Sequence, residues 1–236
     1  MKFDFIIGNP PYNRGLVKKD LPIYNHPSIG SNKLPYVAFI IKALELSHES
    51  TIISFIIPAT VLAGKSKQRI RSDLIAAGRL DILDMQTGVN CFGCGLSRII
   101  ILNIDKSKTG VYVNNRPVDY EAMPDKIIPL FKSKEDEDIY LQLIRDRGIL
   151  SNGGKLDSTK WVVEVSCMHF LWRAPKSRMV EPGLDVCKWF FIYPRDSEAE
   201  CKKLYDWLNS ELAMKLITGL FLAQNVYHTL KYLPGE

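Results

Sequence analysis

The sequence lacks the features that mark membrane, secreted or disordered proteins. No apolar run approaches the roughly 20 residues that a membrane-spanning helix requires. The start does not resemble a signal peptide, and no low-complexity tract is present. The composition, 24% charged and 46% hydrophobic, is that of an ordinary globular protein. We therefore expect a cytoplasmic protein with no membrane partner.

Cysteine is scarce. The five cysteines are odd in number and scattered, which fits a reducing compartment better than a disulfide framework. Cys91 and Cys94 have the spacing of a zinc-ligand pair, but neither a second pair nor a histidine couple accompanies them. We expect no metal.

Positive charge is in modest excess and unevenly distributed. The net charge is +5, and residues 1–120 hold 15 Lys and Arg against 9 Asp and Glu, a balance of +6. A basic region of this kind fits a polyanionic partner such as double-stranded DNA.

The most informative stretch is the first twelve residues. Phe3 to Ile7 is an apolar run typical of a buried strand, and it stops at Gly8, because the prolines that follow cannot continue a ladder. The next residues are Asn9-Pro10-Pro11-Tyr12. They form a stiff loop at the carboxyl end of a strand, where open α/β sheets bind ligands. A side-chain carbonyl, a backbone carbonyl and an aromatic face together suit an exocyclic amine on a flat ring.

These four residues resemble the Asn-Pro-Pro-Tyr motif of Eco57I-like restriction-modification methyltransferases, which act on N6 of adenine in DNA. The resemblance implies that the adenine is flipped out of the duplex and stacks on Tyr12. Asn9 and Pro10 would accept the two N6 hydrogens, the amine would attack the methyl group of S-adenosylmethionine, and Pro11 would line the substrate site. The alternative is that Asn-Pro-Pro is only a turn.

The rest of the chain predicts an α/β fold. Helical stripes at 35–48 and 66–77 alternate with apolar runs at 51–57, 80–85 and 98–104, which indicates a mostly parallel sheet. The resemblance extends over about residues 3–105 and implies a partial Rossmann-like methyltransferase sheet. We divide the chain into a catalytic half (1–118), a connector (119–154) and a smaller α+β region resembling a target-recognition domain (155–236). In that last region, one helix is expected at 201–220.

A basic cluster follows the second apolar run: Lys65, Lys67, Arg69 and Arg71. It fits either contacts with the DNA backbone or an ordinary solvated helix face. The preceding residues, Ala59 to Ser66, also fit a relaxed phosphate-binding loop. The first glycine of that pattern is missing, however, and apolar residues stand where the backbone should wrap phosphate.

One expected element is absent. In the methyltransferases that the motif resembles, a Gly-rich turn and an acidic residue hold the cofactor, and neither is found here in the expected place. We therefore expect weak binding of S-adenosylmethionine by this chain alone, and a protein partner or second copy in the functional state. The chain would be part of a split methyltransferase, an inactive remnant, or a non-catalytic protein that binds DNA or a methylase.

Overall fold

The computed structural model describes residues 1–12, 21–29, 33–87, 98–150, 157–166, 177–184, 190–220, 230 and 232–236. The chain divides into two compact units, Met1–Pro129 and Leu130–Glu236. The division into three parts at 118 and 154 stays a prediction. Within the described ranges, no helix has the length and apolar character to cross a membrane.

The first unit is built on a six-stranded mixed sheet with the order β1-β2-β4-β3-β5-β6. Its strands are β1 (Phe3–Gly8), β2 (Ser47–Pro58), β3 (Arg79–Thr87), β4 (Arg98–Asp105), β5 (Val111–Val113) and β6 (Arg116–Pro117). β1 is parallel to β2, and β3 is parallel to β5, but β4 is antiparallel to both β2 and β3. The fold is mixed α/β. β1, β2, β3 and β5 run in one direction and β4 and β6 in the other, so the prediction of a mostly parallel sheet holds for strand direction but misses the antiparallel strand β4 in the middle of the sheet. The segment 88–97, between β3 and β4, is shorter than the dozen or so residues that a parallel crossover needs.

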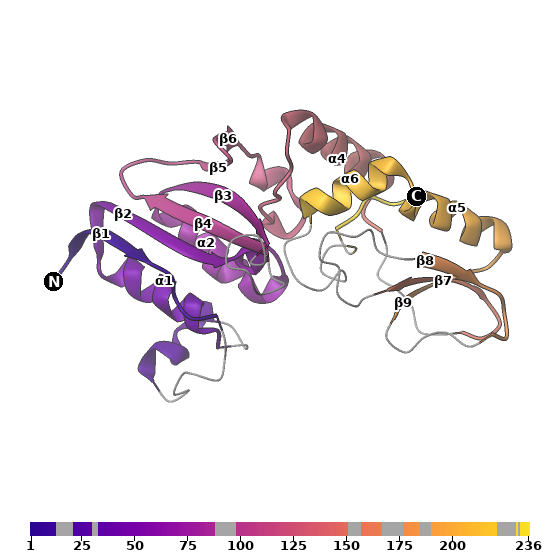
Figure 1. The fold of residues 1–236 in the computed structure, drawn as a ribbon, viewed down its shortest axis with the longest axis horizontal. Coiled ribbons are helices and arrows are strands. Elements are labelled where there is room, and N and C mark those ends of the chain that lie inside the picture. Colours follow the sequence, from indigo (N-terminus) through magenta and orange to yellow (C-terminus); the bar gives the residue numbers. More distant parts are fainter. Residues whose placement is uncertain are drawn as a thin grey trace. The chain divides into compact units, whose positions relative to one another are not determined.

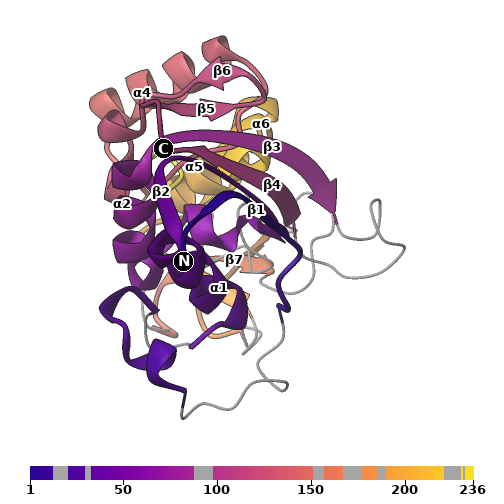
Figure 2. The same ribbon diagram turned by 90° about the vertical axis from the view of Figure 1, so that its left-hand side faces the viewer.

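Two helices pack on one face of this sheet, as Figures 1 and 2 show. α1 (Pro35–Glu45) begins with proline, which is favourable at a first helical position. α2 (Gln68–Ala77) follows a short 3-10 turn. The apolar stripes of both helices are buried, as are the alternate residues of β2. These core residues include Val37, Ile40, Ile41, Ile70 and Leu74 from the helices and Ile53, Phe55 and Ile57 from β2.

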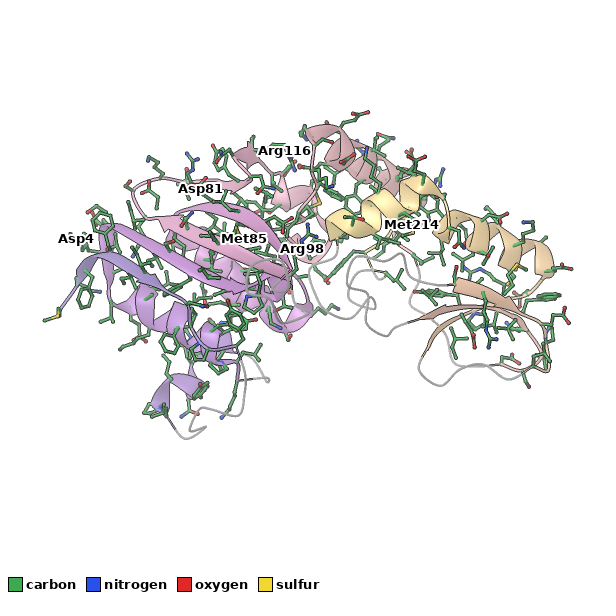
Figure 3. The ribbon with its side chains drawn as sticks, viewed as in Figure 1. Asp4, Asp81, Met85, Arg98, Arg116 and Met214 are labelled. Atoms are coloured by element: carbon green, nitrogen blue, oxygen red, sulfur yellow. The ribbon has the colours of Figure 1, made fainter. Side chains whose placement is uncertain are left out.

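The opposite face of the sheet is apolar and exposed along β1. Phe5 is 66% exposed and Ile7 78%, beside Ile52 at 39%. The prediction that β1 is buried is therefore wrong. The reason is its position: β1 is the edge strand, and within the described residues it pairs only with β2. Asp4, labelled in Figure 3, lies on this strand with its Oδ1 2.9 Å from Nε2 of His48.

The second unit contains a three-stranded antiparallel sheet with the order β8-β7-β9. Its elements are α4 (Lys134–Arg147), β7 (Trp161–Ser166), β8 (Ser177–Val180), β9 (Phe190–Arg195), α5 (Glu198–Leu208) and α6 (Glu211–Leu220). α5 packs against all three strands. α4 begins with an acidic run. Ser133 caps the helix by accepting from the Asp136 amide, and acidic side chains favour a first turn.

The single helix predicted at 201–220 is wrong. α5 and α6 are separated at Asn209 and Ser210. The Asn209 amide donates to the carbonyl of Tyr205, and the Ser210 hydroxyl accepts from the amide of Ala213. The first helix therefore ends and the second is capped within two residues, although the apolar stripe continues through both.

Candidate functional site

The Asn9–Tyr12 loop leaves the carboxyl end of β1. Gly8, the last residue of the strand, is opposite Phe55 of β2, and a Cβ atom at Gly8 would lie only 3.2 Å from Cε1 of that ring. Glycine thus permits a close approach of the strand end to the aromatic side chain. Pro10 is buried, whereas Asn9 is exposed. The loop is packed from behind, and a ligand can reach the Asn9 side chain.

The Tyr12 hydroxyl joins this loop to the neighbouring strand. It lies 2.9 Å from Oδ1 of Asn9 and 3.0 Å from the carbonyl oxygen of Ile56, near the end of β2. Both distances are within the range for hydrogen bonds in which the hydroxyl donates. Sequence alone predicted stacking by the Tyr12 ring and gave no signal for a role of its hydroxyl.

A second tyrosine holds the loop that follows β2. Tyr36, the second residue of α1, has its hydroxyl 3.0 Å from Oγ1 of Thr60. Burial raises the pKa of Tyr36 to about 12, although its hydrogen bond with Thr60 acts in the opposite direction. Its hydroxyl is therefore protonated at neutral pH and fixes the start of α1 beside the end of β2.

Two adjoining cavities lie beside the motif loop. The smaller, about 490 Å³, is lined by β1, the motif loop and α1, and Asn9, Pro10 and Pro11 border it. The larger, about 710 Å³, is lined by residues 21–26 and α1. Phe39 and Lys42 line both. The space beside the motif is therefore mostly apolar with a few polar groups, which is the common character of small-molecule sites.

The smaller cavity does not fit the adenosine end of S-adenosylmethionine. In Rossmann-like folds a carboxylate commonly holds the ribose hydroxyls of a nucleotide cofactor. None of the described residues that line this cavity is acidic. The described lining of this cavity thus lacks the carboxylate that commonly holds the ribose of a nucleotide cofactor.

The predicted basic cluster is divided by the fold. Lys65 and Arg69 are exposed and Lys67 is half-buried, but Arg71 is only 1% exposed. The expectation that all four share one accessible surface is wrong for Arg71. A helix residue two positions after Arg69 points to a different side, and here that side faces the interior of the unit.

The Arg71 guanidinium links three chain segments. It donates to the carbonyl oxygens of Gly64 at 3.0 Å, Asp125 at 2.9 Å and Lys126 at 3.3 Å. Asp125 and Lys126 have left-handed φ values of 51° and 48°. Arg71 thus holds a turn of unfavourable backbone conformation against the amino end of α2.

The phosphate-loop alternative also disagrees with the geometry. Ala59–Leu62 forms a 3-10 turn in which Val61 and Leu62 are fully buried. The carbonyl of Gly64 accepts from Arg71. Side chains pack into the core here, where a phosphate-binding loop would present converging amide groups.

A buried ion pair lies at the same end of the sheet. Arg98 of β4 donates to Asp84 of β3 through Nε at 3.0 Å and Nη2 at 2.6 Å, and the two side chains are 3% and 12% exposed. Figure 3 labels Arg98 and Met85 at this end. In the sequence, the pair is indicated only by the opposite charges of Asp84, near the end of β3, and Arg98, at the start of β4. Cys91 and Cys94, between the strands, lie outside the described residues.

Residues 1–92 match the model of the Eco57I restriction-modification methylase family. The matched segment contains the Asn9–Tyr12 loop, α1 and α2 and ends before β4. It covers less than half of the 236 residues. No curated protein matches the chain.

Solved structures similar to this chain come from much larger proteins. The DrdV–DNA complex has a TM-score of 0.41 and 16% identity, covering 48% of this chain and 14% of that chain. The ATP-dependent Type ISP restriction-modification enzyme LlaBIII bound to DNA has a TM-score of 0.36 and 16% identity, covering 46% and 10%. The M protein of the type I restriction enzyme EcoKI has a TM-score of 0.34 and 16% identity, covering 91% and 48%. The chain spans less than half the length of each of these proteins. All three TM-scores are below 0.5, so the function of this chain is inferred from its own residues and not from these structures.

Proposed function

We propose that this chain is the catalytic part of an adenine-specific DNA methyltransferase, which transfers a methyl group from S-adenosylmethionine to N6 of adenine. The observation that carries the proposal is the motif loop. An exposed Asn9 stands beside a buried Pro10 at the carboxyl end of β1, within the segment that matches a restriction-modification methylase family. A fixed pair of acceptors beside an aromatic residue suits a flipped adenine, which is read by hydrogen bonds and stacking.

In this proposal each residue of the loop has one task. Oδ1 of Asn9 and the carbonyl of Pro10 accept the two N6 hydrogens and orient the amine. The ring of Tyr12 stacks on the base, and Pro11 lines the same cavity as Asn9. The buried side of the loop keeps the two acceptors at a fixed separation, which favours one approach of the amine.

Double-stranded DNA is the proposed substrate, and three basic residues are proposed to contact its phosphates. Lys65, Lys67 and Arg69 have side chains at the surface, so they remain candidates, whereas Arg71 is assigned to structure. Base recognition is assigned to region 155–236, whose described part forms β7–β9, α5 and α6.

A further polypeptide segment is proposed to complete the cofactor site. The cavity beside Asn9 has no described acidic lining residue. The edge strand β1 also carries two exposed apolar side chains, Phe5 and Ile7. An edge strand with exposed apolar side chains can pair with a further strand. A protein partner or a second copy of the chain would cover it.

The alternative is a non-catalytic protein that binds DNA or a methylase partner. The lack of a carboxylate in the described lining of the smaller cavity favours this alternative. Incorporation of labelled methyl groups into DNA, measured with and without candidate partner proteins, separates the two functions. DNA binding with no methyl transfer in any combination would support the binding protein.

The direct test of the catalytic loop is Asn9→Ala. We expect methyl transfer to fall by about 100-fold or more, the size of effect seen when one fixed polar group is lost from an active site. DNA affinity should change little, because phosphate contacts supply most of it. Asn103→Ala, at a half-buried asparagine of β4 that lines neither cavity, is the control. Full activity of Asn9→Ala would reduce the motif to a turn.

The direct test of the DNA contacts is the salt dependence of binding. Replacing Lys65, Lys67 and Arg69 together by glutamine should reduce the slope of log affinity against log salt by about 2.7, at about 0.9 per lost phosphate contact. Lys108→Gln, at an exposed lysine outside the cluster, should leave the slope unchanged. Equal slopes for the triple variant and the unmodified protein would assign the cluster to solvent.

A further inference from the structure

The hydroxyl of Tyr12 has one proton, and two acceptors among the described residues lie at nearly equal distance from it. Oδ1 of Asn9 lies at 2.9 Å and the carbonyl oxygen of Ile56 at 3.0 Å. A hydroxyl donates one hydrogen, so it shares that hydrogen between the two or alternates between them. The two acceptors belong to different elements, the motif loop and β2. The Tyr12 hydroxyl therefore connects the Asn9 side chain to strand β2 of the sheet.

In this arrangement the Tyr12 hydroxyl already donates to Oδ1 of Asn9, the atom that the proposed function assigns to the adenine amine. If Asn9 receives the adenine amine, its Oδ1 must accept an N–H from the base. In the free protein the Tyr12 hydroxyl contacts that oxygen. Since Ile56 offers a second acceptor at the same distance, the hydroxyl can donate fully to the β2 carbonyl when the amine arrives. Neither the hydroxyl nor Oδ1 then loses hydrogen bonding during binding, which would otherwise carry a penalty.

We propose that the Tyr12 hydroxyl is a positioning group that holds Oδ1 of Asn9 toward the substrate side and releases it to the incoming amine. This role is separate from stacking by the ring, and it rests on the proposed function. While the hydroxyl donates to Asn9, it favours the orientation in which the oxygen of the carboxamide, and not the NH2 group, lies beside it. No covalent step is involved.

Tyr12→Phe tests the role, because it removes the hydroxyl and keeps the ring. In single-turnover methylation by the active complex, we expect the rate of transfer to fall by about five- to tenfold, the equivalent of about one net hydrogen bond. DNA affinity and KM should stay within about twofold. Tyr112→Phe, at a half-buried tyrosine of β5 whose ring contacts Arg79, is the matched control and should behave as the unmodified protein. An unchanged rate in Tyr12→Phe would overturn the proposal.

A second measurement does not depend on methyl transfer. The side-chain NH2 signals of Asn9 are followed by NMR during titration with adenosine and with N6,N6-dimethyladenosine, which has no N6 hydrogen. We expect adenosine alone to shift them, and Tyr12→Phe to shift them before any ligand is added. No response to adenosine, or equal responses to both nucleosides, would overturn the release of Oδ1 to the amine. If no combination of proteins methylates DNA, the proposed function fails while this measurement still decides how the hydroxyl is used.

Discussion

Arg71→Met gives a sharp test of the structure, because the sequence and the fold assign this residue different tasks. The side chain is 1% exposed and donates to three backbone carbonyls. Hydrogen bonds to charged groups contribute about 1.5–3 kcal/mol each, but the freed carbonyls regain part of this from water as the turn opens. Each buried carbonyl that stays unsatisfied after the substitution costs about 1–3 kcal/mol. We expect a loss of about 4 kcal/mol in the free energy of unfolding.

Urea denaturation and DNA binding together distinguish a structural role of Arg71 from contact with DNA phosphates. Arg69→Met is the control, since its side chain is exposed on the same helix, and it should change the unfolding free energy by less than about 0.5 kcal/mol. Under conditions in which Arg71→Met is folded, its salt slope for DNA binding should equal that of the unmodified protein. A stable Arg71→Met protein with a slope reduced by about 0.9 would show that Arg71 contacts phosphate after all.

Three further predictions concern packing, pH and charge burial. Gly219→Ala should lower the free energy of unfolding by about 1–3 kcal/mol in urea titrations, because its Cβ would lie 2.0 Å from Cδ1 of Phe131; an unchanged midpoint would mean that the ring moves aside freely. Burial raises the pKa of Tyr36 to about 12, so its contribution to stability is present below pH 10 and is lost as the pH rises from 10 through 12. Between pH 9 and 12 the unmodified protein should therefore lose about 2 kcal/mol more than Tyr36→Phe, and equal losses would contradict the assignment. Asp84→Ala removes the bidentate partner of the buried Arg98 and should cost about 3–5 kcal/mol in the same assay, whereas a cost below about 1 kcal/mol would show that the pair is not buried in solution.

Much of the first unit could be predicted from the sequence, because the signals for its strands and helices lie within short segments of the chain. A β-branched apolar run needs no tertiary information to indicate a strand, and Gly8 followed by two prolines fixes where β1 ends. α1 also follows from its apolar stripe and first-position proline. The motif loop was therefore placed correctly at a strand end, with Asn9 and Tyr12 close together.

Tertiary contacts decided the points that sequence could not. An apolar strand looks the same whether it lies in the centre of a sheet or at its edge, so the exposure of Phe5 and Ile7 was not predictable. In the sequence, Arg71 cannot be distinguished from its basic neighbours. Its burial depends on the orientation of the helix, and two of its partners, Asp125 and Lys126, lie more than 50 positions away. The Tyr12 hydroxyl likewise meets Ile56 across 44 positions.

The motif loop is held against the sheet at both of its ends. Two prolines fix φ directly after the strand, so the loop has few backbone conformations open to it. Gly8 already lies close to the ring of Phe55, which limits movement toward β2. The Tyr12 hydroxyl ties the far end of the loop to Ile56. The position of Asn9 relative to β2 is therefore set by three features together: the edge strand that precedes it, the contact of Gly8 with Phe55, and the hydrogen bond of the Tyr12 hydroxyl.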